Sequence, residues 1–380
     1  MHLPPFLLDQ WLAAHEFATP PIRYNLASST GPAWNFGELM ALADRDIATE
    51  LDELRVSYVP PEGTKALRQS LAKLHDVDPD WVVLTTGASE ALSALFCLAA
   101  EPGASIALPN PGFPGFAALA RAWGLTVTTY ELERQSDFAQ TADLVLAAVK
   151  EKTRLVLVNT PHNPTGAVMA PAQVVRLAAA LADRGIPLIV DEVYHPLYFG
   201  TPAPSAAKLP NTIVVGDLSK ALSLSGLRIG WLIERDARRR EHLINLRSYF
   251  TVSGSPITEA IAVHALAHRQ AILSRLESVT RANLALLENF MNTHAGTLGW
   301  VRPCGGTVAF PWCLDVRDAR PMCEALAREG VLVAPGDCFD AREHFRLGFG
   351  AQTIGFQEAL DILSRIVALI APVSAKRAPV

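Results

Sequence analysis

The chain has 380 residues, which exceeds what one hydrophobic core usually serves, and a guide of about 150 residues per domain predicts two or three domains. Half of the residues are hydrophobic and 19% are charged, which excludes a disordered or fibrous chain. Lys and Arg number 33 against 38 Asp and Glu, and the resulting net charge of −5 argues against a nucleic-acid-binding surface.

The apolar runs are of strand length, and none approaches the roughly 20 residues that a membrane-spanning helix needs. The N-terminal segment lacks the basic start of a secretory signal. The five cysteines are scattered without a CxxC pair, which favours free thiols in a reducing compartment over disulfides or a metal site. The sequence therefore predicts a cytoplasmic protein with no bound metal and no membrane partner.

Short apolar runs alternate with helix-like stretches from about residue 82 to residue 233. This pattern predicts an α/β fold with a mostly parallel central sheet flanked by helices. In such sheets the ligand binds beyond the carboxyl ends of the strands, so polar residues directly after the runs are the leading candidates for a site. The predicted strands are residues 82–86, 105–109, 155–160, 187–192, 212–219 and 230–233.

The last hundred residues have a different pattern. Apolar residues at helical spacing between 272 and 290 predict a long amphipathic helix that links two domains. Short strands and helices then alternate up to residue 370, which predicts a smaller α+β domain. We predict a large α/β domain of residues 45–280 and a small domain made of residues 1–44 together with 281–380.

Lys220 follows the apolar run that ends near residue 217, within the segment DLSKALSLSGLRIGW. An arbitrary lysine is a solvated surface residue. Here the neighbours are small or apolar, Ser219 supplies a hydroxyl, and Arg228 follows eight residues later, which suits a desolvated amine beside an anion site. Such an amine can form a Schiff base with an aldehyde cofactor.

Asp191 closes the apolar run IPLIV, where a carboxylate is costly unless it has a partner. It could be a helix cap or a member of an ion pair. It could also hold a pyridine nitrogen in its protonated form, which makes the ring an electron sink. Tyr194, three residues later, could direct its hydroxyl at the same ring.

Two turns after predicted strands complete the candidate site. The segment PHNPTGA contains Asn163 and reads equally well as an ordinary turn or as the source of a hydrogen-bond donor to a ring oxygen. Gly87, Ala88 and Ser89 begin a helix after a strand, and the backbone amides of a helix start bind phosphate well. The mononucleotide GxxxxGKS and dinucleotide GxGxxG patterns are absent there, so the phosphate belongs to another ligand.

These motifs, in this order, resemble the class I/II pyridoxal-phosphate-dependent aminotransferases of fold type I, and the resemblance runs from about residue 24 to residue 370. The segments FGEL, PHNPTGA and LSKALSLSGLRIGW are also similar to the capreomycidine synthases, which carry out replacement and ring closure. The resemblance implies pyridoxal 5′-phosphate as the cofactor. It also implies a homodimer with shared active sites.

The resemblance gives roles to residues around the cofactor ring. Lys220 is expected to bind the cofactor as a Schiff base and to move the substrate proton. Asp191 is expected to pair with the pyridine nitrogen, while Tyr194 and Asn163 bond the phenolic oxygen. Phe113, in NPGFPGF, is expected to stack on the ring, although core packing is the alternative.

The resemblance also implies the ligands of the two anionic groups. The expected phosphate ligands are Gly87, Ala88, Ser89, Ser219 and Arg228, together with Tyr58 acting on the phosphate of the neighbouring subunit. Arg346 is expected to bind the substrate α-carboxylate, because a planar guanidinium donates two parallel hydrogen bonds.

Asp217 departs from the family pattern, because many relatives have a hydroxyl residue three positions before the lysine that touches the phosphate. An anion there would repel a phosphate, so either Asp217 points away or the phosphate seat differs.

The resemblance implies ping-pong transamination between an α-amino acid and a 2-oxo acid. Elimination, replacement with cyclisation and decarboxylation remain open, because the motifs around the cofactor do not decide which substrate bond is broken. A regulatory, non-catalytic module is disfavoured by the negative charge.

Overall fold

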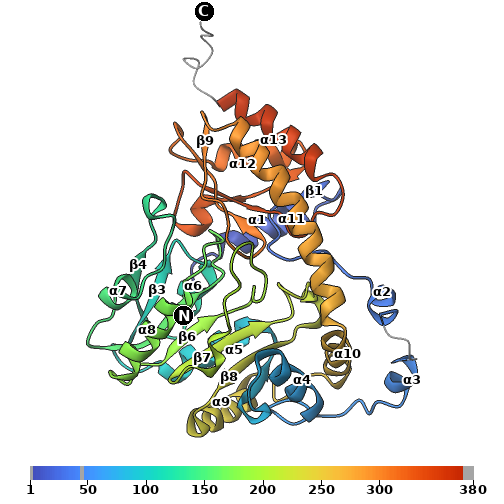
Figure 1. Ribbon diagram of the computed structural model, residues 1–380, viewed down its shortest axis with the longest axis vertical. Helices are drawn as coiled ribbons and strands as arrows, with labels where there is room; N and C mark the ends of the chain where they lie inside the picture. Colours follow the sequence, from blue (N-terminus) through green and yellow to red (C-terminus); the bar gives the residue numbers. More distant parts are fainter. Residues whose placement is uncertain (1–2, 43–46, 371–380) are drawn as a thin grey trace, which may run out of the picture.

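The computed structural model describes residues 3–42 and 47–370. A seven-stranded sheet with helices on both faces occupies one half of the molecule, and a smaller group of short strands and helices occupies the other (Figure 1). The α/β fold class expected from the alternating pattern is confirmed.

The large sheet is parallel except at one strand. Its order is β2-β8-β7-β6-β5-β3-β4, and only β8 runs antiparallel to its neighbours. The central strands are almost completely buried, which explains why they appear in the sequence as continuous apolar runs. The strands are β2 (Val82–Thr85), β3 (Ser105–Asn110), β4 (Thr126–Glu131), β5 (Thr153–Asn159), β6 (Leu188–Asp191), β7 (Thr212–Asp217) and β8 (Gly230–Glu234).

Helices form a layer on each face of this sheet. One face packs against α5 (Gly87–Ala99), α6 (Pro114–Ala122) and α9 (Ala237–Phe250). The other packs against α4 (Lys65–His75), α7 (Ala142–Ala147), α8 (Pro171–Ala182) and α10 (Pro256–Ala267). Burial of apolar side chains on both faces therefore holds the sheet between two helical layers.

The long helix α11 (Arg269–Thr293) runs from the region of the large sheet to the smaller part of the molecule (Figure 1). This part contains α12 (Arg320–Arg328), α13 (Phe356–Ile370) and the strands β9 (Leu298–Gly299), β10 (Val308–Ala309), β11 (Trp312–Cys313), β12 (Val331–Leu332), β13 (Ala334–Pro335) and β14 (Phe345–Gly348). Among the described residues, no helix is both long and apolar enough to cross a membrane.

The N-terminal segment joins the smaller part only at its beginning. It contains α1 (Leu7–Glu16), β1 (Tyr24–Asn25), α2 (Phe36–Met40) and α3 (Ile47–Asp52), and β1 pairs in parallel with β12. In contrast, α2 lies beside the half that holds the large sheet, where its Leu39 carbonyl accepts a hydrogen bond from His264 of α10 (Figure 1). The expected boundary between residues 44 and 45 lies outside the described residues. The second expected boundary, between 280 and 281, falls within α11. The division into two domains stays a prediction.

The start of α5 lies against the start of β8. A Cβ atom on Gly230 would lie 2.3 Å from the backbone carbon of Gly87, so only a residue without a side chain allows this approach. The contact matters for the site, because it fixes the first turn of α5 relative to the carboxyl edge of the sheet.

We expect Gly230→Ala to lower the free energy of unfolding by about 1–3 kcal/mol, because backbone atoms at the clash cannot move aside as a flexible side chain can. Urea denaturation would measure the change. The matched control is Gly226→Ala, since a Cβ on Gly226 has no atom within 4 Å. Equal losses in the two variants would contradict this account of the contact.

Candidate active site

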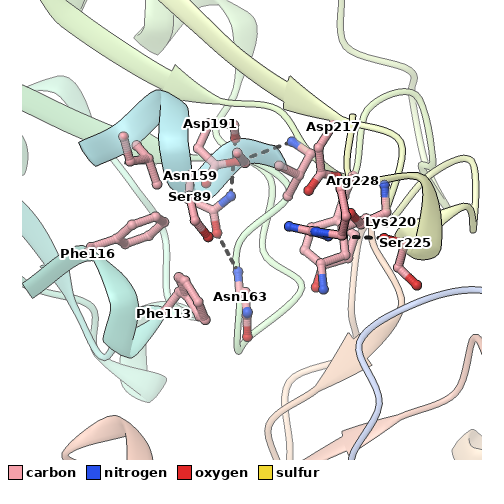
Figure 2. A pocket seen from close by; sticks show the side chains of 15 residues that line it. Ser89, Phe113, Phe116, Asn159, Asn163, Asp191, Asp217, Lys220, Ser225 and Arg228 are labelled. Carbon is pink, nitrogen blue, oxygen red and sulfur yellow. Dashed lines mark hydrogen bonds between the residues drawn. The ribbon is translucent and has the colours of Figure 1, made fainter. Parts of the chain in front are cut away.

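A cavity of about 200 Å³ opens at the carboxyl edge of the large sheet (Figure 2). The strands and the segments that follow them contribute Asp191, Tyr194, Ser219 and Lys220. Helix starts and connecting turns contribute Ala88, Ser89, Phe113, Asn163 and Arg228. The structure therefore brings nine of the residues expected from the sequence to one cavity.

Asn159, at the end of β5, organises the centre of the site. Its side-chain amide donates a hydrogen bond to the Asp191 carbonyl at 3.1 Å, and its Oδ1 accepts one from the Asn163 backbone at 2.7 Å (Figure 2). Asn159 and Asp191 are direct neighbours in the register of β5 and β6. The turn that carries Asn163 is thus tied to the edge of the sheet.

Asp191 is a buried carboxylate with one close donor. Its Oδ1 accepts a hydrogen bond from the Val193 backbone at 3.1 Å, and the side chain is 4% exposed. Burial raises the pKa of Asp191 to about 7, although the Val193 N–H opposes the shift. A cationic partner inside the cavity would restore the charged form.

Arg346, on β14, reaches the site from the smaller part of the molecule. Its Nη1 donates to Asn163 Oδ1 at 3.1 Å and its Nη2 donates to the Ala27 carbonyl at 2.7 Å, while Nε has no partner among the described residues. The side chain is buried, and burial lowers its pKa. The guanidinium therefore keeps one N–H available at a fixed place beside Asn163.

Lys220 is half-buried, and its Nζ donates a hydrogen bond to Ser29 Oγ at 2.9 Å. Burial lowers the pKa of Lys220, and the nearby carboxylates of Asp217 and Asp191 oppose this shift. Ser29 lies 191 residues before the lysine and was not expected to bond it.

The amino end of α5 and Arg228 form a cradle for an anion. Gly87 begins the helix with a φ of +75°, and a Cβ there would lie 2.5 Å from Arg228 Nη2. Arg228 itself has a φ of +54° and is held by an Nη1 hydrogen bond to the Ser225 carbonyl at 3.0 Å. Backbone N–H groups, the helix dipole and a guanidinium therefore meet at one end of the cavity.

Tyr194 and Phe113 lie on two sides of the cavity. The Tyr194 hydroxyl lies near Ser29 and Thr307 but makes no hydrogen bond of good geometry within the described part of the chain. Burial raises the pKa of Tyr194 to about 12, so it stays a hydroxyl donor. The Phe113 ring lines the cavity and packs perpendicular to the Phe116 ring, with the two ring centroids 5.4 Å apart (Figure 2).

Tyr58 lies outside the cavity, whereas Asp217, Asn159 and Ser225 line it. Tyr58 is 85% exposed and does not line the cavity of its own chain, so its expected role across a subunit boundary stays a prediction. Asp217 lines the same cavity, which favours the alternative in which the phosphate seat differs from that of many relatives. Asn159 and Ser225 also line the site, although neither was expected to bind the cofactor.

Comparison with known proteins identifies the family. The sequence model described as "Aminotransferase class I and II" matches residues 37–363. The chain belongs to the class I and II aminotransferase family. The chain is also similar to an enzyme whose name states a different activity. The capreomycidine synthase of Streptomyces vinaceus is 32% identical over 367 residues, which cover 95% of this chain and 93% of that protein.

Two other similar proteins carry the aminotransferase name. The histidinol-phosphate aminotransferase of Haloferax volcanii is 31% identical, with 82% of each chain covered. A pyridoxal-phosphate-dependent aminotransferase from Streptococcus suis has a solved structure with a TM-score of 0.90 and 26% identity, covering 98% of this chain and all of that chain. The chain is thus a pyridoxal-phosphate-dependent aminotransferase of fold type I.

The residues of the cavity fit pyridoxal phosphate. The cradle at Gly87 and Arg228 suits the phosphate, and Asp191 lies at the sheet edge with no cationic side chain of the described residues hydrogen-bonded to it. The buried Tyr194 hydroxyl lacks a good partner, and Lys220 lines the same cavity. This arrangement supplies an anion seat, a carboxylate, a hydroxyl donor and an amine, which are the groups that the cofactor requires.

We expect Asp191 and Glu192 to contribute a loss of stability to the cofactor-free protein as the pH rises from about 4 to about 7. Burial raises their pKa values from 3.8 and 4.5 to about 7, so these two carboxyls bind more protons in the folded state than in the unfolded state. Buried His75, His162 and His195, whose pKa values burial lowers to about 3, about 3 and about 4, contribute with the opposite sign, so the test is the change in slope on substitution. Each carboxyl contributes at most about 1.4 kcal/mol per pH unit.

Asp191→Asn should flatten this dependence, as measured by urea denaturation of the cofactor-free protein at several pH values. Glu192→Gln is the matched comparison and should remove a similar share, because Glu192 is equally buried but is bonded to Ser205 and Ala206. A slope that neither substitution changes would show that the two carboxyls are already ionised in the folded protein.

Proposed function

We propose that the protein transfers an amino group from an α-amino acid to a 2-oxo acid by a ping-pong mechanism. The observation that carries the proposal is the placement of Lys220 and Asp191 in one cavity, with Arg346 hydrogen-bonded to Asn163 beside it. The bound pyridoxal phosphate supplies an aldehyde that accepts the amino group and a ring that takes up the electron pair of the broken Cα–H bond.

Lys220 acts as the proton carrier in this proposal. Burial lowers the pKa of its amine, so the neutral form that accepts a proton becomes more populated near neutral pH. Its Nζ already donates to Ser29 Oγ, which holds the amine at one place in the cavity. The same Nζ can therefore take a proton from the substrate Cα and deliver it to carbon C4′ of the cofactor.

Arg346 orients the substrate. Its partners, the Asn163 side chain and the Ala27 carbonyl, are neutral, so a substrate carboxylate offers a stronger hydrogen bond to the buried guanidinium. Binding there places the amino end of the substrate toward Lys220. The unpartnered Nε is one of the donors available to that carboxylate.

We also propose that two copies of the chain complete each site. Tyr58 lies before the two prolines that lead to α4, and its side chain is almost fully exposed. Aromatic side chains are enriched at protein–protein interfaces. In a homodimer, Tyr58 of one protomer would approach the phosphate cradle of its partner.

A second candidate function is replacement with ring closure. It is favoured by the similarity to the capreomycidine synthase of Streptomyces vinaceus, which spans 95% of this chain. The two functions differ in the first half-reaction: transamination yields one 2-oxo acid per site from the amino donor alone and leaves the amino group on the enzyme. Replacement with cyclisation instead returns an amino acid that keeps its α-nitrogen.

Lys220→Ala should reduce turnover by at least about 100-fold, because a positioned proton carrier contributes that much or more. The measurement is the rate of 2-oxo acid formation with a panel of amino donors. Lys208→Ala is the control, since Lys208 pairs with Asp76 on the surface and should keep the wild-type rate. Full turnover without Lys220 would contradict the proposed role.

Arg346→Lys should raise the KM for the amino donor by roughly 10- to 100-fold with a smaller effect on kcat, because a lysine cannot donate two parallel bonds to a carboxylate. Steady-state kinetics with an amino acid and with the corresponding amine, which lacks the carboxylate, would separate the two effects. The amine should show little difference between wild type and variant. A KM unchanged for the amino acid would remove Arg346 from carboxylate binding.

A further inference from the structure

Asp217 ends β7 inside the same cavity as the phosphate cradle (Figure 2). Its side chain is 8% exposed, and its Oδ1 accepts a hydrogen bond from the Ser219 backbone at 2.9 Å. The antiparallel pairing of β7 with β8 puts Asp217 opposite Gly230, the residue that touches the start of α5. The carboxylate therefore lies close to the amino end of α5, where the cradle is built.

Three charged side chains face Asp217 from the elements around it. Lys220 follows its own strand, Arg228 precedes β8, and Asp191 ends the neighbouring strand β6. The acidic residue in the first turn of α5, Glu90, is bonded elsewhere, to Arg247 and Thr251. Two basic side chains and one carboxyl group therefore make up the electrostatic environment of Asp217.

The residues that line the cavity include two basic side chains, Lys220 and Arg228, and two carboxyls, Asp191 and Asp217. A phosphate with close to two negative charges would meet Arg228 and the dipole of α5, with Asp217 as an additional anion at the same end. Like charges held this close raise each other's pKa values.

We propose that Asp217 takes up a proton when the cofactor phosphate binds, so that cofactor affinity falls as the pH rises. The proton comes from solvent and is held on one carboxylate oxygen. The other oxygen keeps the hydrogen bond from the Ser219 backbone. The protonated carboxyl is then a donor to the phosphate, in the place where a hydroxyl residue serves many relatives.

The surroundings of Asp217 favour this uptake. Burial raises its pKa even without the phosphate, while Lys220 and the Ser219 backbone oppose the shift. Because the pKa of Asp217 is higher in the cofactor-bound protein than in the free protein, affinity is greatest below the free-protein value and declines above it.

The test compares the dissociation constant of pyridoxal phosphate for wild type and Asp217→Asn between pH 6 and pH 9, followed by the absorbance of the bound cofactor. The asparagine side chain has nearly the same shape as aspartate and carries no charge. Asp217→Asn should bind pyridoxal phosphate about 10- to 100-fold more tightly than wild type at pH 9, with a smaller difference at pH 6. Titration of the phosphate itself is common to both proteins and cancels in the ratio. Titration of Lys220 does not cancel, because the Asp217 carboxylate raises the pKa of that amine, and pyridoxal, which lacks the phosphate, measures this part.

Calorimetry gives a second readout. At pH 8, titrations in buffers of different ionisation enthalpy should show that wild type takes up about one proton more than Asp217→Asn for each cofactor bound. Asp217→Ser, which restores a hydroxyl, should behave like Asp217→Asn. Glu192→Gln is the matched control, since Glu192 is a buried carboxyl outside the cavity lining and should keep the wild-type affinity profile.

Pyridoxal without its phosphate is the ligand control. Wild type and Asp217→Asn should differ much less in the pH dependence of their affinity for pyridoxal than for pyridoxal phosphate. The inference is overturned if pyridoxal phosphate binds equally to both proteins at every pH, if Asp217→Asn binds it more weakly at alkaline pH, or if pyridoxal separates the two proteins as strongly. Since no turnover is measured, any of these results leaves the proposed amino transfer standing.

Discussion

The site depends on the two hydrogen bonds that Asn159 makes at the edge of the large sheet. One holds the carbonyl of Asp191 on the next strand, and the other holds the backbone of Asn163. Asn163 in turn accepts from Arg346, which belongs to the smaller part of the molecule. The buried side-chain amide of Asn159 thus connects the strand that carries Asp191 with Asn163, and through Asn163 with Arg346. It therefore helps to fix the positions of all three residues.

Much of this arrangement could be predicted from local sequence. Buried parallel strands give continuous apolar runs, and their carboxyl ends meet at one edge, so Asp191, Asn163 and Lys220 could be placed together from their positions after such runs. The edge strand β4 was not predicted, because only one of its six residues is buried and no apolar run marks it. The antiparallel direction of β8 was also hidden, since a run of apolar residues carries no sign of its direction.

Hydrogen-bond partners that lie far apart in the chain could not be predicted from the sequence for a different reason. Lys220 bonds a serine 191 residues away, and Arg346 bonds a carbonyl 319 residues away, and neither distance leaves a periodic trace. Asp217 lies between these cases. Its departure from the family pattern marked it as an anomaly near a phosphate seat, but only the structure shows that Asp217 lines the cavity, opposite Gly230 of β8.

The reach of Arg346 also has a consequence for the order in which the protein is made on the ribosome. All seven strands of the large sheet have been synthesised by residue 234, so the sheet and the lysine-bearing edge can assemble while the last third of the chain is still missing. The guanidinium arrives more than a hundred residues later and joins Ala27, one of the earliest residues to emerge. A nascent chain can therefore build the cofactor end of the site long before it can build the substrate end.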